Sequence, residues 1–123
     1  MVERFEQIIK KLKSVDFHDI PVKSFYVEHD EKLVVKIEYF LYIEDKRDYE
    51  EFVLIFSEIE TLKFQEFIFT KEGDIEIASF DYKIENDCLV CKITFLTGFG
   101  LASIYLDIKC RNIEIVKKDA KSI

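Results

Sequence analysis

Tryptophan is absent from this sequence, and glycine, proline and cysteine are scarce, with three, one and three residues among 123. So little glycine and proline leaves little room for long flexible linkers, and we predict a single domain over residues 1–123. The three cysteines are an odd number and form no recognisable disulfide framework. This usage is typical of the reducing cytosol, so we predict a cytoplasmic protein.

Long apolar runs and a surplus of basic residues are also missing. Charged residues interrupt every apolar run before the roughly 18–20 residues that a membrane helix needs. The 18 Lys and Arg residues against 25 Asp and Glu residues give a net charge of −7, which opposes nonspecific binding to nucleic acid or to anionic membranes. A basic protein partner or a neutral ligand is compatible with this charge, and so is a charge that only maintains solubility.

Hydrophobic residues make up 49% of the sequence, including 12 Phe and 6 Tyr, which is enough to fill a core. Near the N-terminus, apolar residues recur at spacings of three, four and seven, which predicts a helix over residues 2–15 with one apolar stripe. The stripe consists of Val2, Phe5, Ile8, Ile9, Leu12 and Val15. We expect it to pack on a sheet, because a helix of this length is marginal without such packing.

From residue 20 to residue 116 the pattern changes to the alternation that is typical of β-strands. Alternating segments lie at residues 20–28, 33–43, 78–84, 89–95 and 102–110, with a short last strand at 113–115. The continuous apolar run 52–56 predicts a strand that is covered on both faces. Residues 59–69 are ambiguous between strand and helix, and we favour a strand with a break near Glu66.

Turn signals separate these segments. They lie at residues 29–32, 73–74, 86–87 and 97–100. Pro21 has no N–H group, so it predicts the start or the edge of a strand. The lysine-rich end of the sequence is predicted to be frayed over residues 117–123.

These patterns predict a mainly β protein of the α+β class. We expect one N-terminal helix packed on a seven- or eight-stranded antiparallel sheet, folded as a sandwich or a half-open barrel. The strands form a β-meander over residues 20–116 with short connections. No second helical period lies between strands, which argues against parallel βαβ units.

Cys88 and Cys91 have the spacing of a zinc or redox motif, but they lie within a predicted strand. Residues three apart on a strand point to opposite faces, so we predict ordinary packing cysteines, with no metal and no cofactor. Nucleophilic catalysis is poorly supported, because His18 and His29 are the only histidines and no motif surrounds a candidate nucleophile. An enzyme is therefore expected less than a noncatalytic protein.

His18 and Asp19 lie at the junction between the predicted helix and the first strand. A histidine beside an aspartate can form a polar pair with an altered pKa, which suits ligand binding or acid–base chemistry. The ordinary structural explanation is that Asp19 caps backbone groups while His18 covers the helix end. We favour that explanation and retain the pair as a candidate ligand site.

The segment Glu44–Glu51 is predicted to be a charged loop, with five acidic and two basic residues around Tyr49. Such a loop is usually only a solvated connection. It can also be a docking surface for a basic protein, in which Tyr49 is the anchor and acidic residues steer association. The partner-binding candidates are Asp48, Tyr49, Glu50 and Glu51.

The order of elements resembles a family of small uncharacterised bacterial proteins, some of which are grouped with immunity proteins of polymorphic toxin systems. The resemblance rests on Phe17-His18-Asp19 after the first helix, on the hairpin that follows, and on the closing run from Phe80 through residues 97–100 to Ile115. It spans most of the chain as a pattern of short motifs. It implies a noncatalytic protein that binds and neutralises a cognate toxin.

Two functions therefore remain as hypotheses. The leading one is a noncatalytic protein-binding module, in the manner of an immunity protein that neutralises a toxin. The alternative is a small-ligand-binding or enzymatic β domain with an aromatic-lined pocket near His18. A deep apolar cavity beside His18 would favour the alternative, whereas a filled core with a flat acidic surface would favour a protein partner.

Overall fold

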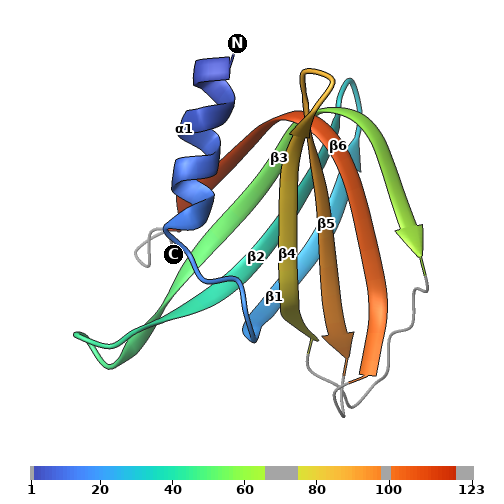
Figure 1. The fold of residues 1–123 in the computed structure, drawn as a ribbon. Helices are drawn as coiled ribbons and strands as arrows, with labels where there is room; N and C mark the ends of the chain where they lie inside the picture. The colour runs from blue at the N-terminus through green and yellow to red at the C-terminus, as the bar shows by residue number, and fades with distance from the viewer. Residues whose placement is uncertain (1, 66–74, 98–100, 119–123) are drawn as a thin grey trace.

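The structure is a computed structural model, which describes residues 2–65, 75–97 and 101–118, with side chains for residues 4–65, 75–96 and 105–118. Within these residues there are one helix and six antiparallel strands, and the strands form a closed barrel in the order β1-β2-β3-β6-β5-β4. The elements are α1 (Val2–Lys13), β1 (Ile20–His29), β2 (Leu33–Ile43), β3 (Asp48–Gln65), β4 (Ile75–Glu85), β5 (Cys88–Thr97) and β6 (Leu101–Lys117) (Figure 1). The mainly β class with one helix is confirmed, but the prediction of seven or eight strands is wrong.

The sequence predicts too many strands because β3 and β6 are long strands along which the alternation of buried and exposed side chains changes phase. They contain 18 and 17 residues. Their pairing register shifts between Ile59 and Thr61, and Glu58 has a left-handed backbone with φ of 51°. The extra residue, which lies in β3, disturbs the alternation of side chains there, and in β6 the buried positions change from even to odd numbers between Cys110 and Ile113, so each strand resembles two in the sequence. Residues 66–69, where the prediction also favoured strand, lie outside the described residues.

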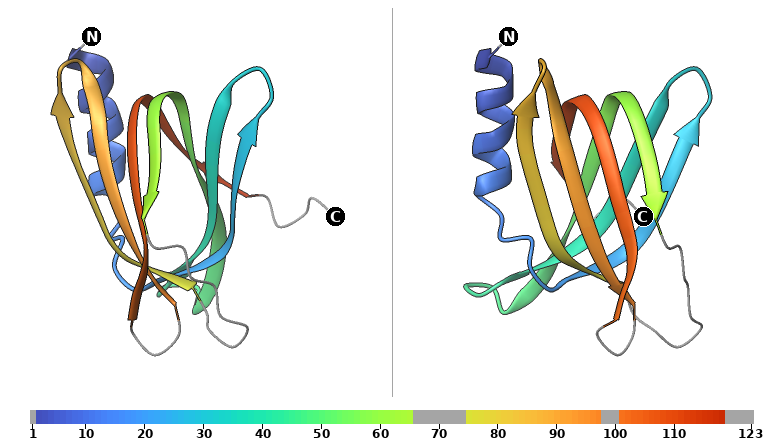
Figure 2. Two further views of the ribbon diagram at one scale, coloured as in Figure 1. Left: turned by 90° about the vertical axis from the view of Figure 1, so that its right-hand side faces the viewer. Right: turned by 45° about the vertical axis from the view of Figure 1, so that its right-hand side comes forward.

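The bulge is also where β3 and β6 bend together, as both views in Figure 2 show. The side-chain amide of Asn112 donates to the Ser57 hydroxyl at 3.0 Å across this bend. The bend divides the barrel wall into two halves that share both strands. The first half contains β1, β2, residues 48–57 of β3 and residues 112–117 of β6, and the second contains β4, β5 and the remaining parts of β3 and β6.

The barrel is closed by a short seam between β1 and β4. The described pairs are Ile20 with Ile77 and Pro21 with Glu76. Pro21 is therefore the second residue of β1, where β1 forms only two described pairs with β4. This position agrees with the strand start or edge predicted from its missing N–H. A closed barrel replaces the predicted sandwich or half-open barrel.

The helix α1 contacts β6, and its ribbon runs alongside the upper part of β4, where the seam does not reach (Figures 1 and 2). Its stripe residues Phe5, Ile8 and Leu12 are buried in the same apolar cluster as the inward-facing strand residues. Arg4 forms an ion pair with Glu58 at the bend of β3. The helix ends at Lys13 rather than residue 15, and no helix in the described part of the chain is long and apolar enough to cross a membrane.

The turn predicted at residues 86–87 is present, because small polar residues there tolerate a left-handed backbone. Asn86 and Asp87 have φ of 49° and 61°, as the two central residues of a type I′ hairpin turn require. The predicted loop 44–51 is shorter than expected, because residues 48–51 belong to β3. The fraying predicted over residues 117–123 is wrong for Lys117, which is in β6, and for Lys118, whose N–H donates to the Glu51 carbonyl at 2.8 Å; residues 119–123 lie outside the described residues. The turns predicted at 73–74 and 98–100 lie outside the described residues.

Candidate functional site

His18 and Asp19 connect α1 to the seam of the barrel. Asp19 has a left-handed backbone with φ of 55°, a conformation that aspartate tolerates better than most residues, and β1 begins directly after it. This turn directs the imidazole of His18 to β4, where Nδ1 lies 2.9 Å from the carbonyl oxygen of Ala78. Nε2 lies 3.4 Å from Oδ2 of Asp19. The predicted His–Asp pair is therefore present, and it is exposed to solvent.

The surroundings of His18 favour the imidazolium form. The hydrogen bond to the Ala78 carbonyl raises the pKa of His18, and the carboxylates of Asp19 and Asp16 raise it further. If Nδ1 donates to the carbonyl, only a protonated Nε2 can interact favourably with Asp19. The His18 ring therefore links the α1–β1 connection to β4 through the Ala78 carbonyl and contacts Asp19 with its other nitrogen.

A groove of about 610 Å³ lies beside His18. One wall consists of residues 12–18, which are the end of α1 and the connection to β1, and the other consists of residues 78–82 of β4. Phe17 and Phe80 contribute aromatic surface, with ring centroids 5.1 Å apart. Lys13, Asp16 and Asp81 place exposed charges on the same walls. The groove combines apolar and charged surface.

The other candidates, Asp48 to Glu51, lie at the start of β3 and alternate between its two faces. Tyr49 and Glu51 pair in register with Tyr42 and Phe40 of β2. Since Tyr39 and Leu54 point into the barrel and are completely buried, strand alternation places Tyr49 and Glu51 on the outer face. Asp48 accepts a hydrogen bond from the backbone N–H of Tyr49 at 2.8 Å.

The acidic residues of this segment are largely neutralised by lysines. Glu50 contacts Lys46 and Lys117, each at 2.9 Å, and these two lysines hold the pKa of Glu50 below its usual value. Glu51 contacts Lys23 at 3.1 Å and Lys118 at 3.9 Å. The free acidic surface that the sequence suggested is therefore not formed by these two glutamates.

Aromatic and apolar side chains lie on the outer face of the first half instead. Tyr42 and Tyr49 are 49% and 56% exposed, with ring centroids 5.2 Å apart. Tyr26 and Val116 are also exposed large hydrophobic residues, and Lys36 lies over the Tyr26 ring at 5.8 Å. We call this surface the aromatic face; its residues are Tyr26, Phe40, Tyr42, Tyr49, Ile55 and Val116.

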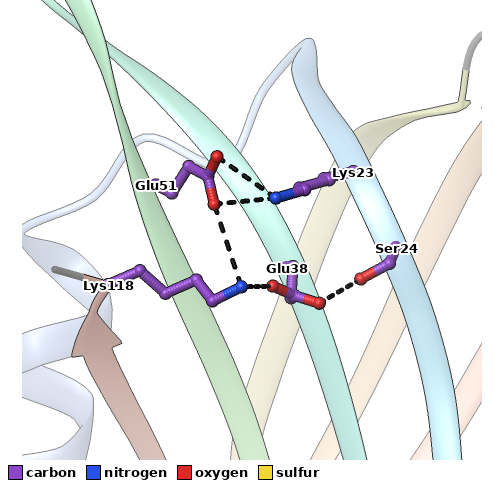
Figure 3. A network of polar contacts seen from close by, with 5 residues as sticks. All are labelled: Lys23, Ser24, Glu38, Glu51 and Lys118. Atoms are coloured by element: carbon purple, nitrogen blue, oxygen red, sulfur yellow. Dashed lines mark hydrogen bonds and ion pairs between the residues drawn. The ribbon is translucent and has the colours of Figure 1, made fainter. Parts of the chain in front are cut away.

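A polar network crosses the aromatic face (Figure 3). Glu38 is only 8% exposed, and its carboxylate accepts hydrogen bonds from Lys118 and from the Ser24 hydroxyl. These two donors lower the pKa of Glu38. Lys118 also reaches Glu51, which accepts from Lys23. The network joins β1, β2 and β3 to the end of β6, and it leaves little uncompensated charge among the apolar side chains.

The outer face of the second half has a different character. Cross-strand pairs place Lys63 opposite Asp107, Asp107 opposite Lys92, and Lys92 opposite Asp81, so opposite charges alternate over four strands. We call this surface the charged face. Such opposite-charge pairs are typical of a solvated sheet surface. The contrast within one barrel indicates that the aromatic face is not simply what this fold presents to water.

The cysteines are free and buried. Cys91 and Cys110 lie in the apolar core, whereas Cys88 donates to the Glu60 carboxylate at 3.1 Å. Hydrogen bonding, to Glu60 and to Cys110 respectively, and then burial raise the pKa of Cys88 and Cys91, which disfavours the reactive thiolate at both. In the part of the chain that the structure describes, no group of three or more His, Cys, Asp or Glu residues is arranged to hold a metal ion.

Comparison with known proteins adds no further assignment, because no protein family, no curated protein and no solved structure matches this chain.

Sequence reasoning found His18, Asp19 and Tyr49, but it missed the remainder of the aromatic face. Tyr42 and Phe40 belong to a strand whose alternation was recognised, and the even-numbered positions of that strand are the outward ones. Two aromatic residues at outward positions were the available signal. Lys118 could not have been found, because it contacts Glu38 from 80 positions away in the sequence.

Proposed function

We propose that this protein is a noncatalytic binding module that docks a partner protein on its aromatic face. The observation that carries the proposal is the exposed pair Tyr42 and Tyr49 on the aromatic face, since the charged face of the same barrel has alternating charges instead. Exposed tyrosines with low side-chain entropy are enriched at protein interfaces and often carry much of the binding energy. The charge-compensated network beside them suits a surface that is desolvated on binding.

The partner that we propose carries a surplus of positive charge, because the net charge of −7 on this chain steers such a protein towards it. The narrower form of the proposal is the one that the family resemblance implies, namely neutralisation of a toxin. Three unpaired thiols support a reducing compartment, and with it the cytoplasmic location that we propose.

Binding of a small ligand inside the barrel is less well supported. Inward side chains from all six strands are fully or largely buried against one another and against the helix stripe. The groove beside His18 lies outside that packed core, and its walls carry exposed charged residues. The burial of these described inward side chains favours recognition at the surface.

The proposal is tested by capture from a lysate of the native cell, with the purified protein immobilised. Mass spectrometry identifies what binds the wild type, the double variant Tyr42→Ala, Tyr49→Ala, and the single variant Tyr105→Ala. Tyr105 is the matched control, because it is a tyrosine on the charged face, where its ring lies near Lys92. We expect a protein that the wild type and Tyr105→Ala retain and that the double variant loses.

Kinetics with the captured protein then separate anchoring from steering. Loss of Tyr49 alone should speed dissociation by about tenfold or more, since a hot-spot residue contributes on the order of 2 kcal/mol. Added salt should slow association, because exposed charges act mainly on the rate of encounter. If the wild type and both variants retain the same protein equally, or if none of them captures a protein, the aromatic face is not the binding surface.

A further inference from the structure

The wall of the groove formed by β4 is the edge of a strand. Among the described residues, β1 pairs with β4 only at Ile77 and Glu76, so residues 78–85 of β4 have a neighbouring strand on one side only, which is β5. The backbone groups on the other side point towards the groove. At one end of this edge Ala78 lies at the register shift between β4 and β5, and its carbonyl is occupied by the His18 side chain, so the edge open to a further strand consists of the residues beyond it.

The groove has the length and the lining for one extended segment. Residues 78–82 span roughly 13–17 Å at the rise of a β-strand. The volume of about 610 Å³ is within the range of ligand pockets, and the groove follows the strand edge between β4 and the end of α1. Extended peptides bind to other folds in this arrangement, with main-chain hydrogen bonds to a free strand edge and side-chain pockets beside it.

The electrostatic character of the groove favours basic residues. Asp16 and Asp81 line its two walls, and Asp19 lies beside His18. The C-terminal end of α1, which carries the negative end of the helix dipole, opens onto the same space. Lys13 and His18 on the walls, with Lys10 and Lys11 in the last turn of α1, offset part of this charge, while the whole chain adds a field from a net charge of −7. Phe17 and Phe80 supply apolar contact between the charged groups.

We infer that this groove binds an extended peptide segment with basic residues, which adds as a strand to the free edge of β4 beside His18. The inference concerns a different surface from the aromatic face and does not depend on it. In this arrangement the segment continues the sheet beyond the point where β1 begins, and Asp16 and Asp81 contact its basic side chains from opposite walls.

The test uses a capped eight-residue peptide in which valine and lysine alternate, and a matched peptide with glutamate in place of lysine. Each is titrated into the whole isotope-labelled protein while backbone amide NMR signals are followed. We expect the lysine peptide to shift the amide signals of residues 78–82 and the glutamate peptide to bind at least about tenfold more weakly. Absence of shifts along β4 at millimolar lysine peptide would overturn the inference.

Two further probes separate strand addition from simple charge attraction. Backbone N-methylation of alternate residues blocks one edge of the peptide, so two peptides methylated in the two alternating patterns are compared. At least one pattern should abolish binding, because addition to β4 uses the N–H groups of one peptide edge. If both methylated peptides bind as well as the parent, the mode of binding is not strand addition.

Charge reversal locates the site. The double variant Asp16→Lys, Asp81→Lys should weaken binding of the lysine peptide by at least about tenfold. The matched double variant Glu31→Lys, Glu44→Lys makes the same change of net charge at exposed positions outside the groove, and it should alter affinity much less. Equal effects of the two variants would overturn the groove as the site. The variant Tyr42→Ala, Tyr49→Ala should bind the peptide normally, which keeps this result distinct from that for the aromatic face.

Discussion

Tyr39 of β2 and Phe52 of β3 are directly paired across the barrel wall, and their rings stack with centroids 5.7 Å apart. Tyr39 is completely buried, and its hydroxyl has no hydrogen-bond partner among the described groups. Burial raises the pKa of Tyr39 to about 12, so the phenol is neutral at physiological pH. A buried hydroxyl without a partner costs about 1–3 kcal/mol, and this cost opposes the favourable packing of the ring.

We therefore expect Tyr39→Phe to leave the free energy of unfolding unchanged or to raise it by about 1 kcal/mol, because the substitution keeps the ring and removes the hydroxyl. Urea denaturation of the variant and the wild type measures the difference. Tyr105→Phe on the charged half is the control, with a change within about 0.5 kcal/mol. A loss of more than about 1 kcal/mol for Tyr39→Phe would mean that the hydroxyl has a stabilising partner.

The link between His18 and Ala78 predicts a dependence of stability on pH. The pKa of His18 is raised in the folded protein above its ordinary value of 6.5, first by the Ala78 carbonyl and then by Asp19. Its contribution to stability is therefore complete below the unfolded pKa and is lost as the pH rises through the folded pKa. The stability difference between wild type and His18→Gln should be larger at about pH 5 than at about pH 9.

NMR titration of the His18 ring protons tests the cause directly. Asp19→Asn should lower the pKa of His18 towards its ordinary value without removing the hydrogen bond to Ala78. A titration midpoint that is the same in the Asp19→Asn variant and the wild type would show that the carboxylate does not contribute.

The network around Glu38 predicts an effect of opposite sign. Lys118 and Ser24 lower the pKa of Glu38 from its ordinary value of 4.5, so its contribution to stability is present above that value and is lost as the pH falls through the folded pKa. We expect Glu38→Ala to cost about 1–2 kcal/mol at neutral pH, at the lower end for hydrogen bonds to charged groups because solvent screens the partly exposed Lys118. Urea denaturation at neutral pH and at about pH 3 should show the cost shrinking in acid.

The helix stripe predicts a larger effect. Phe5 is 3% exposed and lies in the same apolar cluster as the barrel interior. Phe5→Ala should cost about 3 kcal/mol or more, as truncation of a buried aromatic residue commonly does. Thermal denaturation measures the loss, and Glu6→Ala on the exposed side of the helix is the control. Melting curves that coincide for Phe5→Ala and the wild type would mean that the helix does not stabilise the barrel.

The parts of the fold that could be predicted are those where one strand face is buried without interruption. The bounds of β2 were predicted correctly at 33–43, because buried residues alternate along its central part. β3 was divided wrongly because the bulge beyond Glu58 interrupts the alternation within a continuous strand, and β6 because its buried positions change phase between Cys110 and Ile113. Sequence periodicity detects which side chains share a face, and it cannot distinguish a bulge from the end of a strand.

The candidate sites show the same limit. The pairing of His18 with Asp19 was visible because the two residues are adjacent in the sequence. The segment 48–51 was predicted as a loop because its charges suggested solvent, whereas Lys117 and Lys118 pair with Glu50 and Glu51 from the far end of the chain. Contacts between residues so distant in sequence depend on the barrel topology, which local patterns do not contain.

The bend shared by β3 and β6 has a consequence for how the protein unfolds. Each of these strands belongs to both halves of the wall, so neither half can lose its strands without removing two strands from the other. The Arg4–Glu58 ion pair and the Asn112–Ser57 hydrogen bond lie where the halves meet. Local opening of one half alone is therefore suppressed, and the barrel should exchange its core amide hydrogens as a single cooperative unit.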